Sequence, residues 1–385
     1  MGHLVCHLID SNMDTAFFRA IARHHNRSRF PVIIGSLAAA GPLQRGMRGF
    51  EVRSFSLDGP RRRQYIGAIW RLTRLIRREG VSLLHAHCFD ATIAGVVAAR
   101  LARVPMVFTR HHSEHHLRLG KRWHTRVDGW CGRQAHRVIA VSEMTKRIMA
   151  EMEGVPGDKV DVVYNGIEPL QEPPVESVER LRRELGLSGE RVCLMLARLH
   201  EEKGHQVLFE ALPSIVTRVG TVAVLLAGDG PHRARFETEV RRLGLGSFVR
   251  FLGRRDDVAQ LITLSSVVVV PSLAESFGFA ALEAMSLGKP VVASSLGGIA
   301  EVVGECGVLT RPGNAESLVM GVCSVLEHLE QAREIGEAGR ARARLFSAGR
   351  MMRGYEAVYT RVLADCKIAG GQRESEEGSA VAADR

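Results

Sequence analysis

The segment 267–293 constrains the fold of this chain more than any other stretch. It begins with four consecutive valines, Val267–Val270, and a second apolar run starts just after Pro290. Between the two runs lie a turn and a helical pattern that contains Glu275 and Glu283, with seven residues between them. Apolar runs joined by a helix predict a βαβ unit of a parallel sheet. Two carboxylates near the carboxyl end of such a strand stand where open α/β sheets bind ligands.

The two glutamates have three interpretations. They can lie on a solvated helix face, they can be the carboxylate pair of a glycoside hydrolase, or they can hold ligand hydroxyls, because an ionised carboxylate only accepts hydrogen bonds. The apolar strand before Glu275 and the helix opened by Gly278 favour ligand binding over a solvated face. A hydrolase is disfavoured because other segments have the features of a diphosphate site, which a hydrolase does not need.

One of these segments follows the apolar run Val192–Leu196. Arg198 comes just after the run, and Lys203-Gly204 precedes a helical pattern. Two cations beside the N-terminus of a helix form an anion site, because the helix dipole and the free N–H groups also favour negative charge. The alternative is a solvated basic loop.

The chain repeats one pattern in two halves. Strand and helix patterns alternate through residues 1–167, and after a Pro-rich linker they start again within 168–349. We therefore predict two α/β domains with these bounds, each with a parallel sheet. An amphipathic stretch at about 350–365 follows and is expected to return to the first domain. Residues 367–385, rich in Gly, Ser and Glu without an apolar stripe, are predicted to be a disordered tail.

The first half has a regular succession of elements. Its strands are predicted at 4–8, 31–34, 53–55, 82–86, 106–109, 138–141 and 160–163. Its helices are predicted at about 13–25, 63–79, 91–102, 121–135 and 143–152, and Ser142 is a candidate N-cap for the last of them.

Positive charge is concentrated in the first half. Residues 1–170 hold 26 Lys and Arg against 14 Asp and Glu, a net charge of +12, while the whole chain carries +10. Such a field attracts polyanions, including nucleic acid, anionic lipid and phosphorylated glycans. The helix at 63–79 places several arginines beside an apolar stripe, so it either covers the sheet or lies on an anionic membrane surface.

Cysteine usage and hydropathy predict a cytoplasmic protein, and the basic first half adds the inner face of the membrane as one location. The seven cysteines stand singly, without a Cys-x-x-Cys pair, which is typical of a reducing compartment. No apolar run approaches the length of a membrane span, and the N-terminus lacks the features of a signal peptide.

The residues described so far resemble a known family. The motif Glu275-Ser-Phe277-Gly278 with Glu283 is similar to the signature of family 4 retaining glycosyltransferases, which have the GT-B fold. The resemblance implies two Rossmann-like domains that face an interdomain cleft, with the acceptor on the first domain and a nucleotide-sugar donor on the second. It implies that Glu283 holds the donor ribose and Glu275 the hydroxyls of the transferred sugar.

The same resemblance extends to the other motifs. It implies that Arg198 and Lys203 neutralise the donor diphosphate, and that Phe277 and Gly278 belong to the donor site. His111 follows the predicted strand at 106–109, and the resemblance places it beside the reacting sugar, so that His111 and Glu275 are the expected catalytic residues. His112 is the alternative if the alignment shifts by one residue.

No cofactor and no metal are expected. The chain has no Asp-x-Asp sequence, and two cations stand where a metal would otherwise neutralise the diphosphate. The run of histidines within 111–116 leaves a metal site open as an alternative.

The sequence thus predicts a retaining hexosyltransferase, EC 2.4, that moves a sugar from a nucleotide-sugar to a glycan or lipid-linked acceptor in cell-envelope polysaccharide or glycolipid synthesis. A nucleotide-sugar epimerase or a phosphorylase-like GT-B enzyme is the first alternative. A nucleic-acid-binding protein or an inactive scaffold is the second. Nucleic acid is not an expected partner, because the chain has no recognisable nucleic-acid module and aromatic residues make up only 5% of it.

Overall fold

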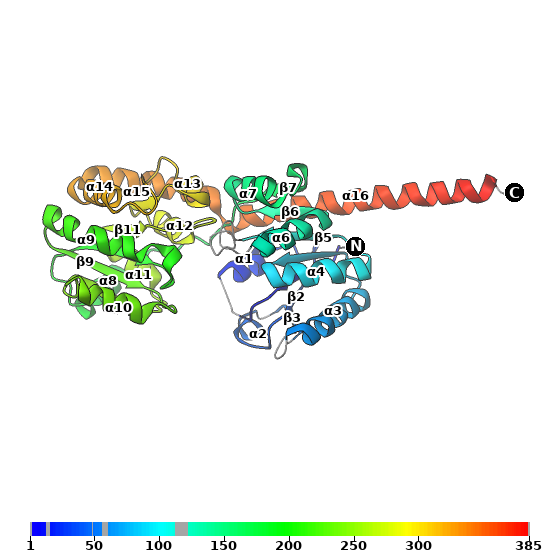
Figure 1. Ribbon diagram of the computed structural model, residues 1–385, viewed down its shortest axis with the longest axis horizontal. Helices are drawn as coiled ribbons and strands as arrows, with labels where there is room; N and C mark the ends of the chain where they lie inside the picture. Colours follow the sequence, from blue (N-terminus) through cyan, green and yellow to red (C-terminus); the bar gives the residue numbers. More distant parts are fainter. Residues whose placement is uncertain (1, 13–15, 48, 56–60, 112–121, 384–385) are drawn as a thin grey trace. The chain divides into compact units, whose positions relative to one another are not determined.

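The computed structural model describes residues 2–12, 16–47, 49–55, 61–111 and 122–383. The chain divides into two compact units (Figure 1). One unit consists of Met1–Gly166 and Ala348–Arg385, and the other of Ile167–Ser347. The boundary predicted after residue 167 lies one residue from this division.

The first unit contains a seven-stranded sheet whose neighbouring strands all pair in parallel, in the order β3-β2-β1-β4-β5-β6-β7. Its strands are β1 (Val5–Ile9), β2 (Val32–Ser36), β3 (Glu51–Ser54), β4 (Leu83–His87), β5 (Met106–Arg110), β6 (Arg137–Ala140) and β7 (Val160–Val162). Its helices are α1 (Ala16–His24), α2 (Pro42–Gly46), α3 (Arg61–Arg78), α4 (Phe89–Ala102), α6 (Arg122–Gln134), α7 (Glu143–Glu153) and α16 (Ala348–Ala383), with a short 3-10 turn at Gly157–Lys159.

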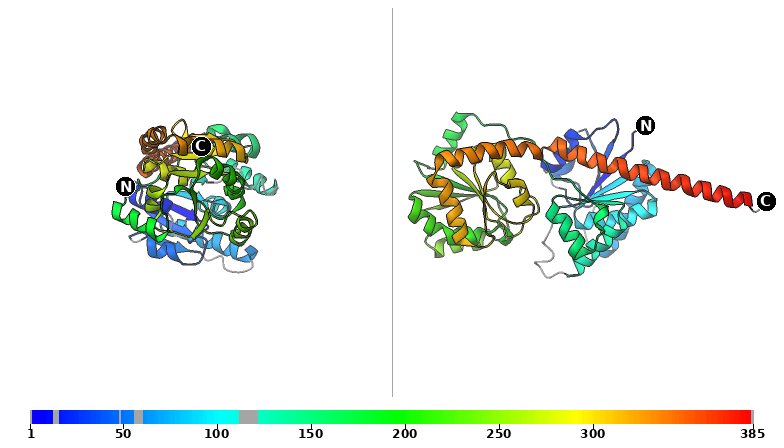
Figure 2. Two further views of the ribbon diagram at one scale, coloured as in Figure 1. Left: turned by 90° about the vertical axis from the view of Figure 1, so that its left-hand side faces the viewer. Right: turned by 90° about the horizontal axis from the view of Figure 1, so that it is seen from above.

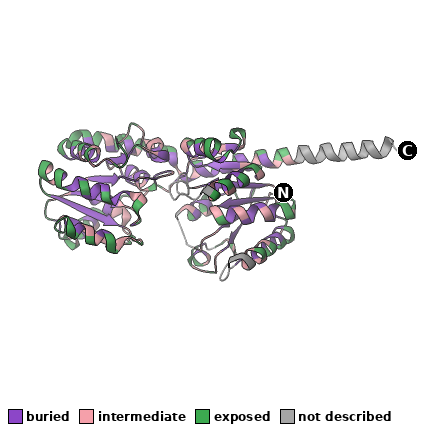
Figure 3. Ribbon diagram, in the orientation of Figure 1, coloured by how far each residue is buried: buried purple, intermediate pink, exposed green. Residues whose placement is uncertain are grey.

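Helices cover both faces of this sheet (Figure 2). Alternate residues of a strand point to opposite faces, so each strand contributes to two cores. Cys6 and Leu8 of β1 pack in one core with residues of α3, α4, α6 and α7. Val5 and Ile9 of the same strand pack in the other with residues of α1 and α16. Figure 3 shows the strands buried between helices whose outer faces are exposed.

The second unit contains a six-stranded parallel sheet in the order β10-β9-β8-β11-β12-β13. Its strands are β8 (Arg191–Leu196), β9 (Val222–Ala227), β10 (Val249–Gly253), β11 (Val267–Val270), β12 (Val291–Ser294) and β13 (Val308–Thr310). Its helices are α8 (Val175–Glu184), α9 (His205–Val219), α10 (Arg233–Arg242), α11 (Val258–Leu264), α12 (Phe279–Ser286), α13 (Gly297–Val303), α14 (Ala315–Glu327) and α15 (Leu329–Ala343), with 3-10 turns at Glu201–Lys203 and Arg344–Phe346.

Local signals in the sequence explain several boundaries. Ser142 is the N-cap of α7, because its hydroxyl oxygen accepts a hydrogen bond from the backbone N–H of Thr145 at 3.1 Å. The helix predicted at about 350–365 is part of α16 and belongs to the first unit. In the structure α16 extends from Ala348 to Ala383.

Candidate active site

The strand order of the second sheet creates a ligand crevice at one place. β8 lies next to β11, and the chain continues from β8 toward β9 on one side and from β11 toward β12 on the other. Ligands of open α/β sheets bind outside the carboxyl ends of the strands at such a switch point. Arg198 follows the end of β8, and Glu275 lies in the loop after β11. The βαβ unit predicted from 267–293 is therefore β11, α12 and β12.

Lys203 and Glu275 lie together at this point. The Nζ atom of Lys203 donates to Oε2 of Glu275 at 2.9 Å, and each side chain is about one-fifth exposed. Both residues and Arg198 line a cavity of about 250 Å³. The Arg198 guanidinium donates to Glu202 at 3.2 Å and is 70% exposed. The structure thus brings two cations and one carboxylate to a single cavity.

Glu283 lines a second cavity, of about 410 Å³, from the middle of α12. Leu196 and Arg198 line both cavities, so the two adjoin. The structure gives the Glu283 carboxylate no partner among the described residues, and burial raises its pKa to about 7. A buried acceptor without a partner is costly to ionise, so this carboxylate is suited to a ligand that donates hydrogen bonds.

Two glycines allow the loops of the site to approach one another. Gly204 has φ +76°, and a Cβ at this position would lie 1.9 Å from the carbonyl oxygen of Pro271. The start of α9 can therefore lie against the end of β11 only with glycine here. Gly278, with φ +99°, precedes α12, and a Cβ there would lie 2.9 Å from Cγ1 of Ile299. These close approaches hold Lys203 beside Glu275.

The side chain of Phe277 does not lie in the donor site that its motif suggests. Its side chain is buried, with its ring packed against Phe279 and Phe346, and it lines neither of the two cavities. Phe279 is 38% exposed and lines the cavity of Lys203 and Glu275. Phe277 therefore supports the loop by packing, and Phe279 is the aromatic side chain at the cavity.

Besides Arg198 and Glu283, the Glu283 cavity is lined by residues that were not among the predicted site residues. They include Asp229, Arg254, Arg255 and Val258. Asp229 follows β9, and the two arginines follow β10, so the rule that ligands bind at strand ends could have found them. Arg255 is held by Asp257, with donor–acceptor distances of 2.8 and 2.5 Å.

The first unit carries His111 at the corresponding edge of its own sheet. His111 follows β5, and its Nε2 atom lies 3.1 Å from Nδ1 of His87, the last residue of β4. The ring of Phe17 contacts the His111 ring edge to face, with centroids 4.9 Å apart. The alternative residue His112 and the rest of the histidine run at 112–116 lie outside the described residues.

A different group of histidines has the spacing of metal ligands. Within the described part of the chain, ligand atoms of His7, His85 and His87 lie within 4.8 Å of one another, and all three residues are buried. Both ring nitrogens of His85 already have hydrogen-bond partners, Tyr359 and Thr109, at 2.5 and 2.7 Å. A metal ion here would have to displace one of them.

Comparison with known proteins identifies the class. The model of the family described as "Glycosyltransferase Family 4" matches residues 16–170, and that of "Glycosyl transferases group 1" matches residues 177–342. The 2-deoxystreptamine glucosyltransferase of Streptomyces kanamyceticus is 31% identical over 279 residues, which are 68% of this chain and 72% of that protein. The N-acetyl-alpha-D-glucosaminyl L-malate synthase of Bacillus anthracis is 28% identical over 304 residues, 77% of this chain and 79% of that protein.

Solved structures agree with these sequences. The crystal structure of Anabaena HepE in complex with UDP-glucose superposes with a TM-score of 0.81 at 25% identity, and the match covers 93% of this chain and 99% of that one. Two Rossmann-like units with parallel sheets and this likeness define a GT-B glycosyltransferase. The chain belongs to glycosyltransferase family 4.

The expected fold and enzyme class, EC 2.4, are therefore confirmed. None of the helices among the described residues is both long enough and apolar enough to cross a membrane.

Proposed function

We propose that this enzyme transfers a sugar from a nucleotide-sugar donor with retention at the anomeric carbon, and that the crevice between β8 and β11 holds the donor. The observation that carries the proposal is the shared cavity of Arg198, Lys203 and Glu275, which adjoins that of Glu283. Cations and carboxylates in adjoining cavities match the diphosphate and the hydroxyls of one nucleotide-sugar. The UDP-glucose complex of the similar Anabaena HepE supports this class of donor.

Each residue then has a chemical role. Arg198 and Lys203 neutralise the diphosphate, Glu283 accepts hydrogen bonds from the ribose, and Glu275 accepts them from the transferred sugar. The ion pair between Lys203 and Glu275 holds both side chains in place before the donor arrives. When the donor binds, its phosphate oxygens compete for the ammonium group of Lys203, and its sugar hydroxyls compete for the carboxylate of Glu275. The one ion pair between these residues is then replaced by two interactions with the donor.

The reaction needs no metal in this scheme. The bond between the anomeric carbon and the diphosphate oxygen breaks, and the acceptor oxygen bonds to the same face of that carbon. The acceptor proton passes to the leaving phosphate oxygen. Arg198 and Lys203 stabilise the negative charge that develops there, which preorganised cations do well, and His111 is the proposed catalytic residue of the first unit.

The test combines binding and turnover in EDTA. Calorimetry with UDP, GDP and ADP identifies the base, and product analysis identifies the anomer.

Turnover of the natural enzyme should persist in EDTA. Turnover should fall by at least about tenfold in Arg198→Met and in Lys203→Met, since a lost charged interaction is worth about 1.5–3 kcal/mol. Arg183→Met, an exposed cation on α8, is the matched control. Full turnover of the Arg198 and Lys203 double variant at saturating donor contradicts the diphosphate assignment, and dependence on added magnesium, manganese or zinc contradicts the metal-free scheme.

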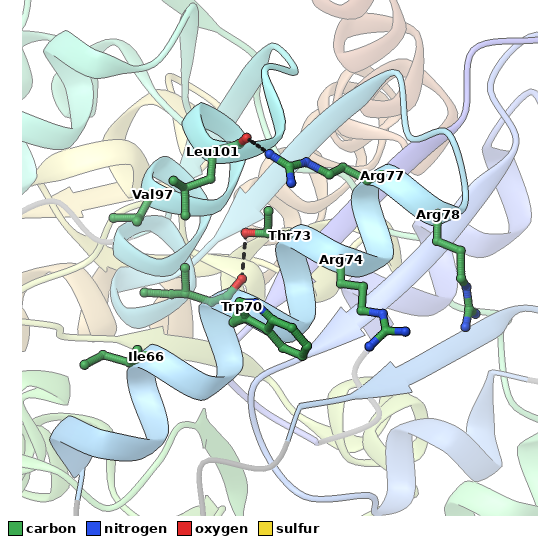
Figure 4. A pocket seen from close by; sticks show the side chains of 9 residues that line it. Ile66, Trp70, Thr73, Arg74, Arg77, Arg78, Val97 and Leu101 are labelled. Carbon is green, nitrogen blue, oxygen red and sulfur yellow. Dashed lines mark hydrogen bonds between the residues drawn. The ribbon is translucent and has the colours of Figure 1, made fainter.

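We propose further that the acceptor is a lipid-linked glycan or glycolipid at an anionic membrane surface, with the enzyme a peripheral protein of the inner face. A groove of about 710 Å³ between α3 and α4 supports this (Figure 4). Ile66, Trp70 and Leu101 line it and are 72%, 61% and 52% exposed. Exposed apolar side chains of this size, with a Trp among them, are typical of surfaces that enter a lipid interface.

Arginines line the same groove. Arg74, Arg77 and Arg78 lie along one side of it, and the guanidinium of Arg74 lies 5.6 Å from the centre of the Trp70 ring. Arg77 donates to the backbone carbonyl of Leu101 (Figure 4). Each basic residue near an anionic leaflet contributes about 1 kcal/mol, and apolar side chains beside it add burial.

Co-sedimentation with vesicles tests this surface. Binding to vesicles that contain phosphatidylglycerol should weaken with salt, and it should fall several-fold in Trp70→Ser and in Arg74→Gln with Arg78→Gln. Met320→Ser, an equally exposed apolar residue on α14, is the control. Equal binding to neutral vesicles, or no binding at low salt, would instead favour a soluble anionic acceptor.

A further inference from the structure

All three tryptophans of the chain lie exposed on helices of the first unit. Trp70 belongs to α3 and lines the groove between α3 and α4, whereas Trp123 and Trp130 belong to α6 and do not line that groove. The three side chains are 61%, 58% and 37% exposed. Because a large aromatic side chain gains free energy when it leaves water, this exposure indicates a surface that a partner covers.

The exposed face of α6 carries a stripe of alternating Trp and Arg residues. The stripe consists of Trp123, Arg126, Trp130 and Arg133, all of them exposed. Residues spaced three and four apart lie on the same side of a helix. Asp128 and Cys131 of the same helix are buried, so α6 has one face in the core and the stripe on its outer face. A helix with aromatic and basic residues on its outer face is typical of an anionic membrane interface.

The stripe and the groove belong to one layer of helices. α4 lies between α3 and α6 and contacts both (Figure 1). All three helices pack in one core on the same face of the sheet. Arg77 of α3 donates to the backbone carbonyl of Leu101 in α4, and Arg100 of α4 donates to the side chain of Gln134 in α6. These bonds tie the three helices into one continuous surface.

The charge of this layer is strongly positive. The helices α3, α4 and α6 hold seven, one and three arginines, with Asp90 and Asp128 as their acidic residues. Asp128 is buried against Arg110 at 2.6 Å, and Asp90 accepts a hydrogen bond from Tyr65 at 3.0 Å. An anionic lipid surface complements this charge, and its interface accommodates both the apolar ring and the polar N–H group of Trp.

We propose that the Trp and Arg stripe of α6 is a second membrane contact, so that the whole layer of α3, α4 and α6 lies on anionic lipid. The proposal rests on the membrane location in the proposed function and extends it from one groove to an oriented surface. The first sheet then lies parallel to the membrane and is separated from it by one helix, roughly 10–12 Å. His111, at the carboxyl edge of this sheet, is then within reach of an acceptor with a short polar head.

The tryptophans are natural reporters of this surface, because the rest of the chain has none. One variant keeps Trp70 alone (Trp123→Phe with Trp130→Phe), and a second keeps Trp130 alone (Trp70→Phe with Trp123→Phe). Each full-length protein is mixed with vesicles of phosphatidylglycerol and of phosphatidylcholine whose acyl chains carry bromine, which quenches Trp fluorescence on contact. We expect quenching in both variants, and we expect it to weaken with salt.

The outcomes separate this inference from the proposed function. Quenching of Trp70 alone would overturn the role of α6 and leave the groove as the membrane site. Quenching of Trp130 alone would contradict the groove and leave α6 as the contact. No quenching of either Trp would overturn both proposals. A response of Trp130 to an oligonucleotide but not to vesicles would identify a nucleic-acid surface instead.

The charge on α6 has a matched control. Arg126→Gln should weaken binding to phosphatidylglycerol vesicles by about fivefold, the effect of one basic residue near an anionic leaflet. Arg23→Gln removes the same charge from an exposed position of α1, which packs on the other face of the sheet, and should leave binding nearly unchanged. Equal losses in the two variants would show that binding follows net charge rather than this face, and would overturn the proposal.

Discussion

At the scale of single residues, Glu283 combines a functional position with an energetic cost. Its pKa lies near 7 in the folded protein because of burial, against 4.5 for a free carboxyl. Below about pH 4.5 the Glu283 carboxyl is protonated in both the folded and the unfolded protein, so its ionisation has no effect on stability. Between pH 4.5 and 7 the unfolded state ionises more readily, so stability falls, and above pH 7 the penalty is constant.

Glu283→Gln should remove this penalty. We expect its free energy of unfolding to exceed that of the natural protein by roughly 1–3 kcal/mol at pH 8, with the difference vanishing near pH 4.5. Urea denaturation across this pH range measures the difference in the free energy of unfolding.

The same variant should bind the nucleotide more weakly, because the neutral amide lacks charge assistance. Glu275→Gln, in which the lost carboxylate is partly exposed and paired with Lys203, should not show this pH-dependent gain. A difference that is constant with pH would contradict the interpretation of Glu283.

At the scale of elements, a buried ion triad joins β5 to α6 and α7. The Arg110 side chain contacts Asp128 at 2.6 Å and Glu153 at 2.5 Å, and all three are nearly inaccessible. Burial raises the pKa of Glu153 to about 7, although Arg110 opposes the shift. The triad lies directly before His111, so it fixes the end of the strand that presents this residue.

Arg110→Met should lower the free energy of unfolding by about 3–5 kcal/mol at pH 7.5, because it leaves two buried carboxylates without a cation. Arg137→Met on β6 is the control, since its pair with Asp161 at 2.9 Å is more exposed and should be worth about 0–1 kcal/mol. Chemical denaturation compares the two. Equal losses would mean that the triad contributes no more than a surface pair.

The sequence predicted most elements because their signals are local. Apolar runs located every strand of the first sheet within two residues, and Ser142 located the start of α7. Arg110 shows what such signals miss. Its partners Asp128 and Glu153 come from helices that lie 18 and 43 residues further along the chain. Asp229, Arg254 and Arg255 line the Glu283 cavity together because β9 and β10 are neighbours in the sheet.

At the scale of the whole molecule, two units, each with its own sheet and core residues, and one returning helix define the architecture. Three apolar clusters of the described residues are each confined to one unit, and α16 completes the first unit although it follows the second in sequence. The amphipathic pattern at 350–365 predicted this helix. The contacts of His7 with His87 and of His87 with His111 were not predictable, because these residues come from β1, β4 and the end of β5, which only the sheet brings together.

The division predicts how fragments behave. Residues 167–347 should fold alone and bind the nucleotide about as well as the full chain. Residues 1–166 should not fold alone, because they lack Tyr355 and Tyr359, which are fully buried in their core. Losing one buried aromatic side chain costs about 3–5 kcal/mol, so the loss of two exceeds the usual stability margin of a domain.

Joining residues 348–366 to 1–166 through a flexible linker should restore folding, because Tyr359 then regains its hydrogen bond of 2.5 Å to His85 and the apolar face of α16 covers the sheet again. Thermal unfolding followed by circular dichroism should show one cooperative transition for this fusion and none for 1–166. A fusion in which Tyr355 and Tyr359 are both replaced by Ser controls for the added length and should stay unfolded. Cooperative unfolding of 1–166 alone, with the midpoint of the fusion, would show that α16 is dispensable for the first unit.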